Sequence, residues 1–187
     1  MGVSGRPRRW LRSTSTWGTD SSTLRRVIRR ATGADQVWIA GVAADVYGEL
    51  GDYGSIIRSW LAHPGVLTYL DEARGERGVA LLRGFTLLGF YEPGIGQPGP
   101  SVADLLAIAV ARTHQRNGVG TRLLEHAIHM AGLTTRAGRA VEMRLTVAET
   151  NRVGRRFFAS FGFRVLDEEH GHYDGGQRAI RMFRTLP

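Results

Sequence analysis

The stretch from residue 102 to residue 131 limits the possible folds more than any other part of the sequence. Residues 102–111, VADLLAIAVA, are apolar at nearly every position, as is typical of a strand buried on both faces of a sheet. Residues 119–131 repeat apolar side chains at helical spacing, and QRNGVG stands between the two patterns. The stretch therefore predicts a central strand, a tight glycine loop and an amphipathic helix that crosses to a parallel strand.

The residues before this unit predict one strand, two helices and a hairpin. Residues 23–32 have strand-like composition, and a short second helix is expected to end at Pro64. Residues 65–72 and 79–92 indicate an antiparallel hairpin, and the Gly- and Pro-rich residues 93–100 indicate a loop. The first helix, from Ala34, is expected to present one apolar face, formed by Val37, Trp38, Val42, Val46 and Tyr47.

The residues after the unit predict a strand, a capped helix and two closing strands. Residues 140–148 alternate as a strand does, and Asn151 is a good N-cap for a helix that ends at Gly162. That helix is expected to bury Val153, Phe157 and Phe161. The loop GHYDGGQ then separates two last strands, so that the whole sheet is mixed.

Length and charge favour one domain with a basic extension. The 187 residues suit a single core, expected over residues 23–187, after a flexible Arg- and Ser-rich segment at residues 1–22. Residues 1–31 hold eight Arg and one acid, whereas the remainder holds 17 Arg and 16 acids, so the net charge of +8 is concentrated in the first 31 residues. This segment leaves open a nucleic-acid-binding arm or a transit peptide, although the exclusive use of Arg also fits a GC-rich genome.

Two absences narrow the class further. The chain has no cysteine, which excludes disulfides, thiolate nucleophiles and Cys-based zinc sites. It also has no continuous apolar segment of the length that a membrane span or a secretory signal needs, so we expect a cytoplasmic protein.

The loop at residues 115–121 has the chemistry of an anion site. The first turn of a helix leaves backbone N–H groups without intrahelical partners, and the helix dipole adds partial positive charge there. Gly118 and Gly120 allow an anion to approach the main chain closely, and Arg116 adds a countercharge. The same two glycines can also serve a tight turn alone, and the spacing matches neither the Walker nor the dinucleotide-binding pattern.

Two blocks of sequence together resemble the GNAT superfamily of N-acetyltransferases. LLAIAVARTHQRNGVGTRLLEHAI is similar to its acetyl-coenzyme A signature Q/R-x-x-G-x-G/A, read here at Gln115, Gly118 and Gly120. RLTVAETNRVGRRFFASFGFRV is similar to its later strand and helix, with Asn151 at the matching position. The resemblance implies a GNAT fold, an α/β fold of the α+β type whose mixed, mostly antiparallel sheet has about six or seven strands and about four flanking helices.

The resemblance also implies how acetyl-CoA, as co-substrate, would be held. The pyrophosphate is expected on the main chain of the glycine loop, and the pantetheine arm against main-chain groups of the preceding strand. Asn151 is expected to contact the coenzyme arm in addition to capping its helix. The expected coenzyme-binding residues are Ile108, Ala109, Val110, Gln115, Arg116, Asn117, Gly118, Val119, Gly120, Thr121 and Asn151.

Two residues are candidates for the catalytic groups. Asp104 lies fourteen residues before Gly118, the separation at which histone-type members place their general base, but it can equally be a structural carboxylate at the end of the strand. The tyrosine that often protonates the departing thiolate is replaced by Phe158, and the glutamate base of another branch by Thr146. Tyr173 in the last loop is the candidate substitute for that tyrosine, with exposure or packing as its other possible role.

The sequence therefore predicts an N-acetyltransferase that passes an acetyl group from acetyl-CoA to a primary amine in a ternary complex. The alternative is a non-catalytic acyl-CoA-binding or regulatory domain, favoured by Phe158 and Thr146. No metal, no membrane and no nucleic acid is expected as a partner, and a homodimer is left open. The acceptor pocket is expected to mix aromatic with acidic residues, which hint at a cationic acceptor: Tyr47, Tyr53, Trp60 and Tyr173 with Asp45, Glu49 and Asp52.

Overall fold

The computed structural model describes residues 25–75, 79–91, 101–136 and 140–186. The expected extension at residues 1–22 and loop at residues 93–100 lie outside these described residues. The elements, in chain order, are β1 (Arg25–Arg30), η2 (Gly33–Asp35), α1 (Gln36–Tyr47), η3 (Gly48–Leu50), α2 (Tyr53–Ala62), β2 (Val66–Arg74), β3 (Ala80–Tyr91), β4 (Ser101–Val110), η4 (Arg112–His114), α3 (Val119–Arg136), β5 (Ala140–Ala148), α4 (Arg152–Ser160), β6 (Arg164–Asp167) and β7 (Ala179–Thr185).

The strands form one sheet of seven in the order β1-β2-β3-β4-β5-β7-β6. The pair β4–β5 is parallel, because α3 carries the chain across the sheet between them, and the other pairs are antiparallel. Strand β4 lies in the middle of the sheet. The predicted element order and the mixed, mostly antiparallel sheet are confirmed.

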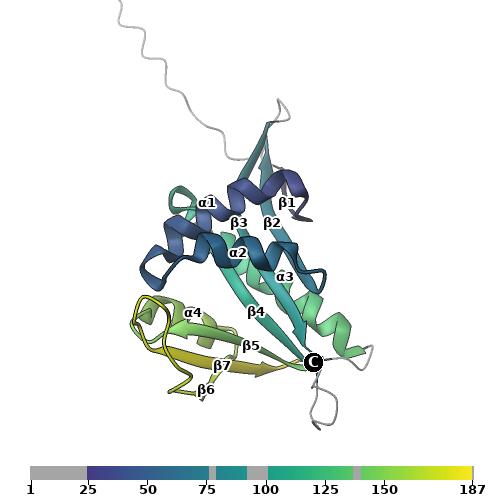
Figure 1. Cartoon of the computed structure of the whole chain (residues 1–187). Coiled ribbons are helices and arrows are strands. Elements are labelled where there is room, and N and C mark those ends of the chain that lie inside the picture. Colours follow the sequence, from purple (N-terminus) through teal and green to yellow (C-terminus); the bar gives the residue numbers. More distant parts are fainter. Residues whose placement is uncertain (1–24, 76–78, 92–100, 137–139, 187) are drawn as a thin grey trace, which may run out of the picture.

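Helices cover both faces of the sheet (Figure 1). Helices α1 and α2 lie on one face, where Ile39, Ala43 and Ile57 are buried against β2, β3 and β4. Helices α3 and α4 lie on the other face, where Leu124 and Phe158 join the second buried cluster. Burial on both faces explains why the central strand β4 has almost no polar positions.

The predicted helix faces are wrong at two positions. Val37 of α1 is 86% exposed and Val153 of α4 is 68% exposed, although both were expected to point inward. Helix α1 carries apolar or small residues on all sides, so that periodicity did not distinguish Val37 from the buried Ile39. In α4 the buried ring is that of Phe158, with Phe157 and Phe161 partly buried beside it.

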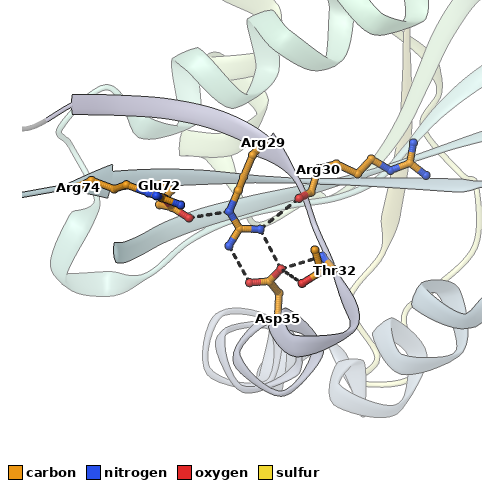
Figure 2. Close-up of polar contacts among 6 residues, drawn as sticks. All are labelled: Arg29, Arg30, Thr32, Asp35, Glu72 and Arg74. Atoms are coloured by element: carbon orange, nitrogen blue, oxygen red, sulfur yellow. Dashed lines mark hydrogen bonds and ion pairs between the residues drawn. The ribbon is translucent and has the colours of Figure 1, made fainter. Parts of the chain in front are cut away.

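A buried ion-pair network fixes the start of the domain (Figure 2). The Arg29 guanidinium contacts Asp35 at 2.8 Å and Glu72 at 2.6 Å, and so ties β1 to the beginning of α1 and to β2. A second oxygen of Asp35 accepts a hydrogen bond from the Thr32 N–H at 2.7 Å. The Arg29 bonds lower the pKa of the Asp35 carboxyl, so Asp35 and Arg29 are both charged at neutral pH.

Candidate active site

Strands β4 and β5 pair at one end and separate at the other. Their parallel register runs from Ser101 and Ala140 to Leu105 and Leu145 and stops there. Strand β4 nevertheless continues to Val110, paired on its other side with β3, and β5 continues to Ala148, paired with β7. The chain therefore opens a gap between two central strands, and the β4 main chain beyond Leu105 faces that gap instead of a partner strand.

The direction of each main-chain group along this edge follows from one bond. The Ala111 N–H donates to the Arg83 carbonyl of β3 at 2.9 Å. Because groups alternate along a strand, the Ala109 main chain also points to β3, whereas Ile108 and Val110 point into the gap. The Tyr47 hydroxyl confirms this direction, since it accepts from the Ile108 N–H at 3.0 Å and donates to the Ile108 carbonyl at 2.5 Å.

The glycine loop follows β4 after the short helix η4 and leads into α3. Gly118 has a φ of 73°, a conformation that favours glycine, and the non-glycine Arg116 also has a positive φ of 62°. The Gln115 amide donates to the Val110 carbonyl at 3.1 Å and folds the loop back onto the end of β4. Helix α3 begins at Val119, so its first-turn N–H groups lie at the loop, the position that the predicted anion site requires.

Asn151 caps α4 at the opposite side of the gap. Its side-chain oxygen accepts from the Gly154 N–H at 2.8 Å, which confirms the predicted N-cap. The residue also lines the cavity described next, so that one side chain fixes the start of α4 and reaches the candidate site.

One cavity of about 1120 Å³ joins these parts. Its volume suits a ligand larger than a typical drug-sized molecule. Most of the predicted coenzyme-binding residues line it, namely Ile108, Ala109, Val110, Gln115, Arg116, Gly118, Gly120, Thr121 and Asn151. Val119 is instead buried beneath the loop, at 1% exposure, and Asn117 is an exposed residue of the loop that does not line the cavity.

The cavity lining suits a ligand that carries phosphate groups and an extended arm. Arg116 and Arg156 line it together with the glycine loop, and this combination suits a phosphate-bearing ligand. At the gap the Val110 N–H points towards the cavity, whereas the Ile108 main-chain groups are bonded to Tyr47 and the Val110 carbonyl is bonded to Gln115. Sequence reasoning missed Arg156, because RVGRR gives no sign of which arginine of α4 faces the cavity.

Three phenols gather where α1 and α2 meet the last loop. The Tyr47 and Tyr53 rings lie 4.9 Å apart, and the Tyr53 and Tyr173 rings 6.3 Å apart. All three line the cavity, as the sequence predicted for the acceptor pocket, and Trp60 supports Tyr53 edge-on at 6.3 Å. Burial raises the pKa of Tyr47 and of Tyr173, so both phenols are neutral hydrogen-bond donors at physiological pH.

A contact between two loops closes over this aromatic group. The Gly175 N–H donates to the Leu50 carbonyl at 3.0 Å, and the Gln177 amide donates to the Glu49 carbonyl at 2.8 Å. We call these four residues the clasp. In Figure 1 the blue turn after α1 and the yellow loop before β7 lie side by side, where the clasp joins them.

The acids expected around the acceptor have different partners. Asp45 pairs with Arg112 at 2.9 Å, and Asp52 caps α2 by accepting from the Ser55 N–H. Glu49 lines the cavity. Two of the three carboxylates that hinted at a cationic acceptor are therefore engaged in holding the loops.

Asp104 lies on β4 beside the cavity but is not among its lining residues. It pairs in register with Gly89 of β3 and with Arg144 of β5. Burial raises the pKa of the Asp104 carboxyl, and the charges of Arg181, Arg144 and His170 oppose that rise. A carboxylate with a raised pKa is a suitable proton acceptor, provided that it reaches the acceptor amine.

The positions of the two missing family residues are well defined. Phe158 is buried, with its ring 5.9 Å from that of Phe163, and Thr146 of β5 lines the cavity.

Within the described ranges, no group of three or more His, Cys, Asp or Glu side chains is arranged to hold a metal ion. The His170 Nδ1 lies 3.7 Å from the Asp167 Oδ2. No helix in the described part of the chain has the length and apolarity to cross a membrane.

Comparison with solved structures places this architecture among acetyltransferases. Arabidopsis thaliana NAA60 in complex with a bisubstrate analogue superposes with a TM-score of 0.70 at 12% identity, covering 87% of this chain and all of that one. The ribosomal-protein-S18-alanine N-acetyltransferase of Escherichia coli gives 0.62 at 19% identity, covering 87% and 94%. The spermidine/spermine N-acetyltransferase SpeG of Vibrio cholerae gives 0.58 at 16% identity, covering 86% and 92%.

At these identities the superpositions establish the fold, and the sequence itself establishes the family. No curated protein matches the sequence significantly. A family model described as the acetyltransferase (GNAT) family matches residues 41–163, which include the second half of α1, the gap between β4 and β5, the glycine loop and Asn151. The chain belongs to the GNAT family of acetyltransferases.

Proposed function

We propose that this protein transfers the acetyl group of acetyl-CoA directly to a primary amine in a ternary complex. The observation that carries the proposal is the continuity of one cavity from the glycine loop, along the open edge of β4, to the three phenols under the clasp. One end suits a polyanionic donor and the other a small organic group. Direct transfer needs no nucleophilic residue, in keeping with a chain that has no cysteine.

The residues of the chain would bind and orient both substrates. The first-turn N–H groups of α3, with Arg116 and Arg156, would hold the phosphates, and Asn151 and the β4 edge would hold the arm. When bound, acetyl-CoA supplies an acetyl thioester, the activated acyl group that an amine attacks. Main-chain N–H groups at the gap would polarise the acetyl carbonyl.

Asp104 is the proposed proton acceptor for the incoming ammonium. Its burial favours the neutral form of the carboxyl, and therefore the uptake of a proton at moderate pH. Arg181, Arg144 and His170 counteract the effect, which keeps a carboxylate population available. Tyr173 lines the acceptor end of the cavity and would contact the acceptor or donate a hydrogen bond there.

A two-stage experiment tests the proposal. Acetyl-CoA at a hundred times its dissociation constant should raise the unfolding free energy by about 2.7 kcal/mol, which a thermal shift detects. A panel of primary amines is then screened for release of free thiol. The expected result is binding followed by turnover of at least one amine class.

A non-catalytic acyl-CoA binder is the second candidate, and Phe158 is the observation that favours it. This ring is packed among Phe157 and Phe163 and has no proton to give. Binding without thiol release across the whole panel would favour this candidate over the enzyme, and absence of binding would exclude both.

A further inference from the structure

At the open edge of β4, the Tyr47 hydroxyl forms hydrogen bonds in the position where a continuous sheet would have another strand. Tyr47 is the last residue of α1, and its hydroxyl bonds both main-chain groups of Ile108, at 3.0 Å to the nitrogen and 2.5 Å to the oxygen. In a parallel pair, these two groups of Ile108 would bond to main-chain groups of the neighbouring strand. The hydroxyl therefore substitutes for a missing partner in the gap.

Ile108 lies at the narrow end of that gap. The Gln115 side chain folds the glycine loop back onto Val110, so an arm that starts at the loop and follows β4 runs towards Leu105, where pairing with β5 closes the gap. The Val110 carbonyl already accepts a hydrogen bond from Gln115. Ile108 is thus the gap-facing residue that the far end of the arm meets, and that end carries the acyl group.

We propose that the Tyr47 hydroxyl holds the place of the acetyl carbonyl oxygen on the Ile108 N–H and becomes a second hydrogen-bond donor to that oxygen when acetyl-CoA is bound. The inference rests on the proposed function, because it assigns a residue to the same site. It gives the cavity a phenol that acts on the acetyl group although residue 158 is Phe.

Hydrogen-bond donation suits Tyr47 better than proton transfer does. Burial raises the pKa of the Tyr47 phenol above its ordinary value of about 10, while an ordinary thiol has a pKa of about 8.5. Full transfer of the phenolic proton to a departing thiolate would therefore be uphill. A neutral phenol packed against Tyr53 can instead stabilise charge that develops on the acetyl oxygen without losing its proton.

The infrared frequency of the acetyl C=O stretch reports the hydrogen bond from Tyr47 without turnover, when bound acetyl-CoA is labelled with ¹³C at the acetyl carbonyl. We expect the stretch to move to lower frequency on binding to the wild-type protein, and to move clearly less in Tyr47→Phe. Tyr53→Phe removes the neighbouring phenol and is expected to keep the wild-type frequency. Equal frequencies in wild type and Tyr47→Phe would overturn the inference while leaving acetyl transfer intact.

A pair of ligands separates donation from a structural role. Coenzyme A lacks the acetyl oxygen, so Tyr47→Phe should bind it at least as tightly as the wild type does, while its preference for acetyl-CoA over coenzyme A falls. With an accepted amine, kcat should fall about 10²-fold, the loss seen when one donor to a developing oxyanion is removed. If Tyr47→Phe bound acetyl-CoA and coenzyme A more weakly by the same factor and had a lowered Tm, Tyr47 would have a purely structural role, and the inference would be overturned. A wild-type protein that binds neither ligand would instead contradict the proposed function itself.

Discussion

Gly175 lies against the carbonyl oxygen of Glu49 so closely that no Cβ fits at residue 175. The contact joins the loop before β7 to the turn after α1, 126 residues earlier in the chain, and it forms part of the clasp over Tyr47, Tyr53 and Tyr173. The shape of the end of the cavity that we propose for the acceptor therefore depends on a glycine that has no role in the coenzyme signature.

Gly175→Ala is expected to push the two loops apart and to disturb the acceptor end alone. The KM for the amine should rise several-fold, while the dissociation constant for acetyl-CoA stays unchanged, because the glycine loop and Asn151 lie elsewhere in the cavity. Gly48→Ala is the matched control, since a Cβ there meets open space at a helical φ of −54°. Steady-state kinetics with varied amine, together with calorimetry for the donor, checks the split; a loss of donor affinity would contradict it.

Gly118→Ala is expected to weaken donor binding through the backbone and not through a clash. A Cβ at residue 118 has open space, but a φ of 73° costs a residue with a side chain about 1 kcal/mol. Relaxation of that strain would turn the N–H groups of the loop away from the phosphates and lower acetyl-CoA affinity at least tenfold. Gly41→Ala, in the interior of α1 with open space around it, should leave affinity unchanged. Wild-type affinity in Gly118→Ala would show that the loop is merely a turn.

Asp104→Asn is expected to abolish most turnover while leaving acetyl-CoA affinity near normal. The base works only when deprotonated, and burial raises its pKa, so the acid limb of the wild-type kcat/KM profile should lie above the ordinary aspartate value of about 3.9. The variant should lack that limb in its residual rate. Turnover at the wild-type level would remove Asp104 from the mechanism.

Asn151→Ala and Asn151→Asp separate the two roles of the cap. Alanine cannot accept the Gly154 N–H bond, so it should cost about 1 kcal/mol of stability and some donor affinity. Aspartate caps as well as asparagine does and should keep the Tm, but it loses the amide donor and places a negative charge in the cavity. Chemical denaturation and donor titration of the two variants test this; normal donor affinity in Asn151→Asp would limit Asn151 to capping.

Asp35→Asn is expected to destabilise the fold by about 2 kcal/mol at pH 7, because it leaves the partly buried Arg29 without one charged acceptor. The Arg29 bonds lower the pKa of Asp35 in the folded state, so its contribution is complete above the unfolded value of about 3.9 and is lost as the pH falls towards the folded value. The gap between wild type and variant should therefore shrink below about pH 4. Asp45→Asn, at the exposed Arg112 pair, should change stability by less than about 1 kcal/mol at either pH.

Local sequence was sufficient to predict the elements and the loop and cap that line the cavity. The apolar pattern of residues 102–111, the glycines of the loop and the Asn151 cap each act over a few residues, and the structure has β4, the start of α3 and the start of α4 where these signals stand. The side of α1 that faces the sheet was not predictable in the same way. Its apolar residues surround the whole helix, and packing against α2 and the sheet decided that Ile39 is buried and Val37 exposed.

By itself, then, the sequence determined that this is a GNAT acetyltransferase domain with a glycine loop between β4 and α3, because those properties depend on short-range patterns. Only the tertiary structure decided which side chain meets the open edge of β4 and which loops meet beside the three phenols. The Tyr47 hydroxyl reaches Ile108 across 61 residues, and Gly175 meets Glu49 across 126, and no local pattern encodes either distance. β4 and β5 separate after Leu105, and the two contacts bring segments that are distant in sequence together around the gap that this separation leaves.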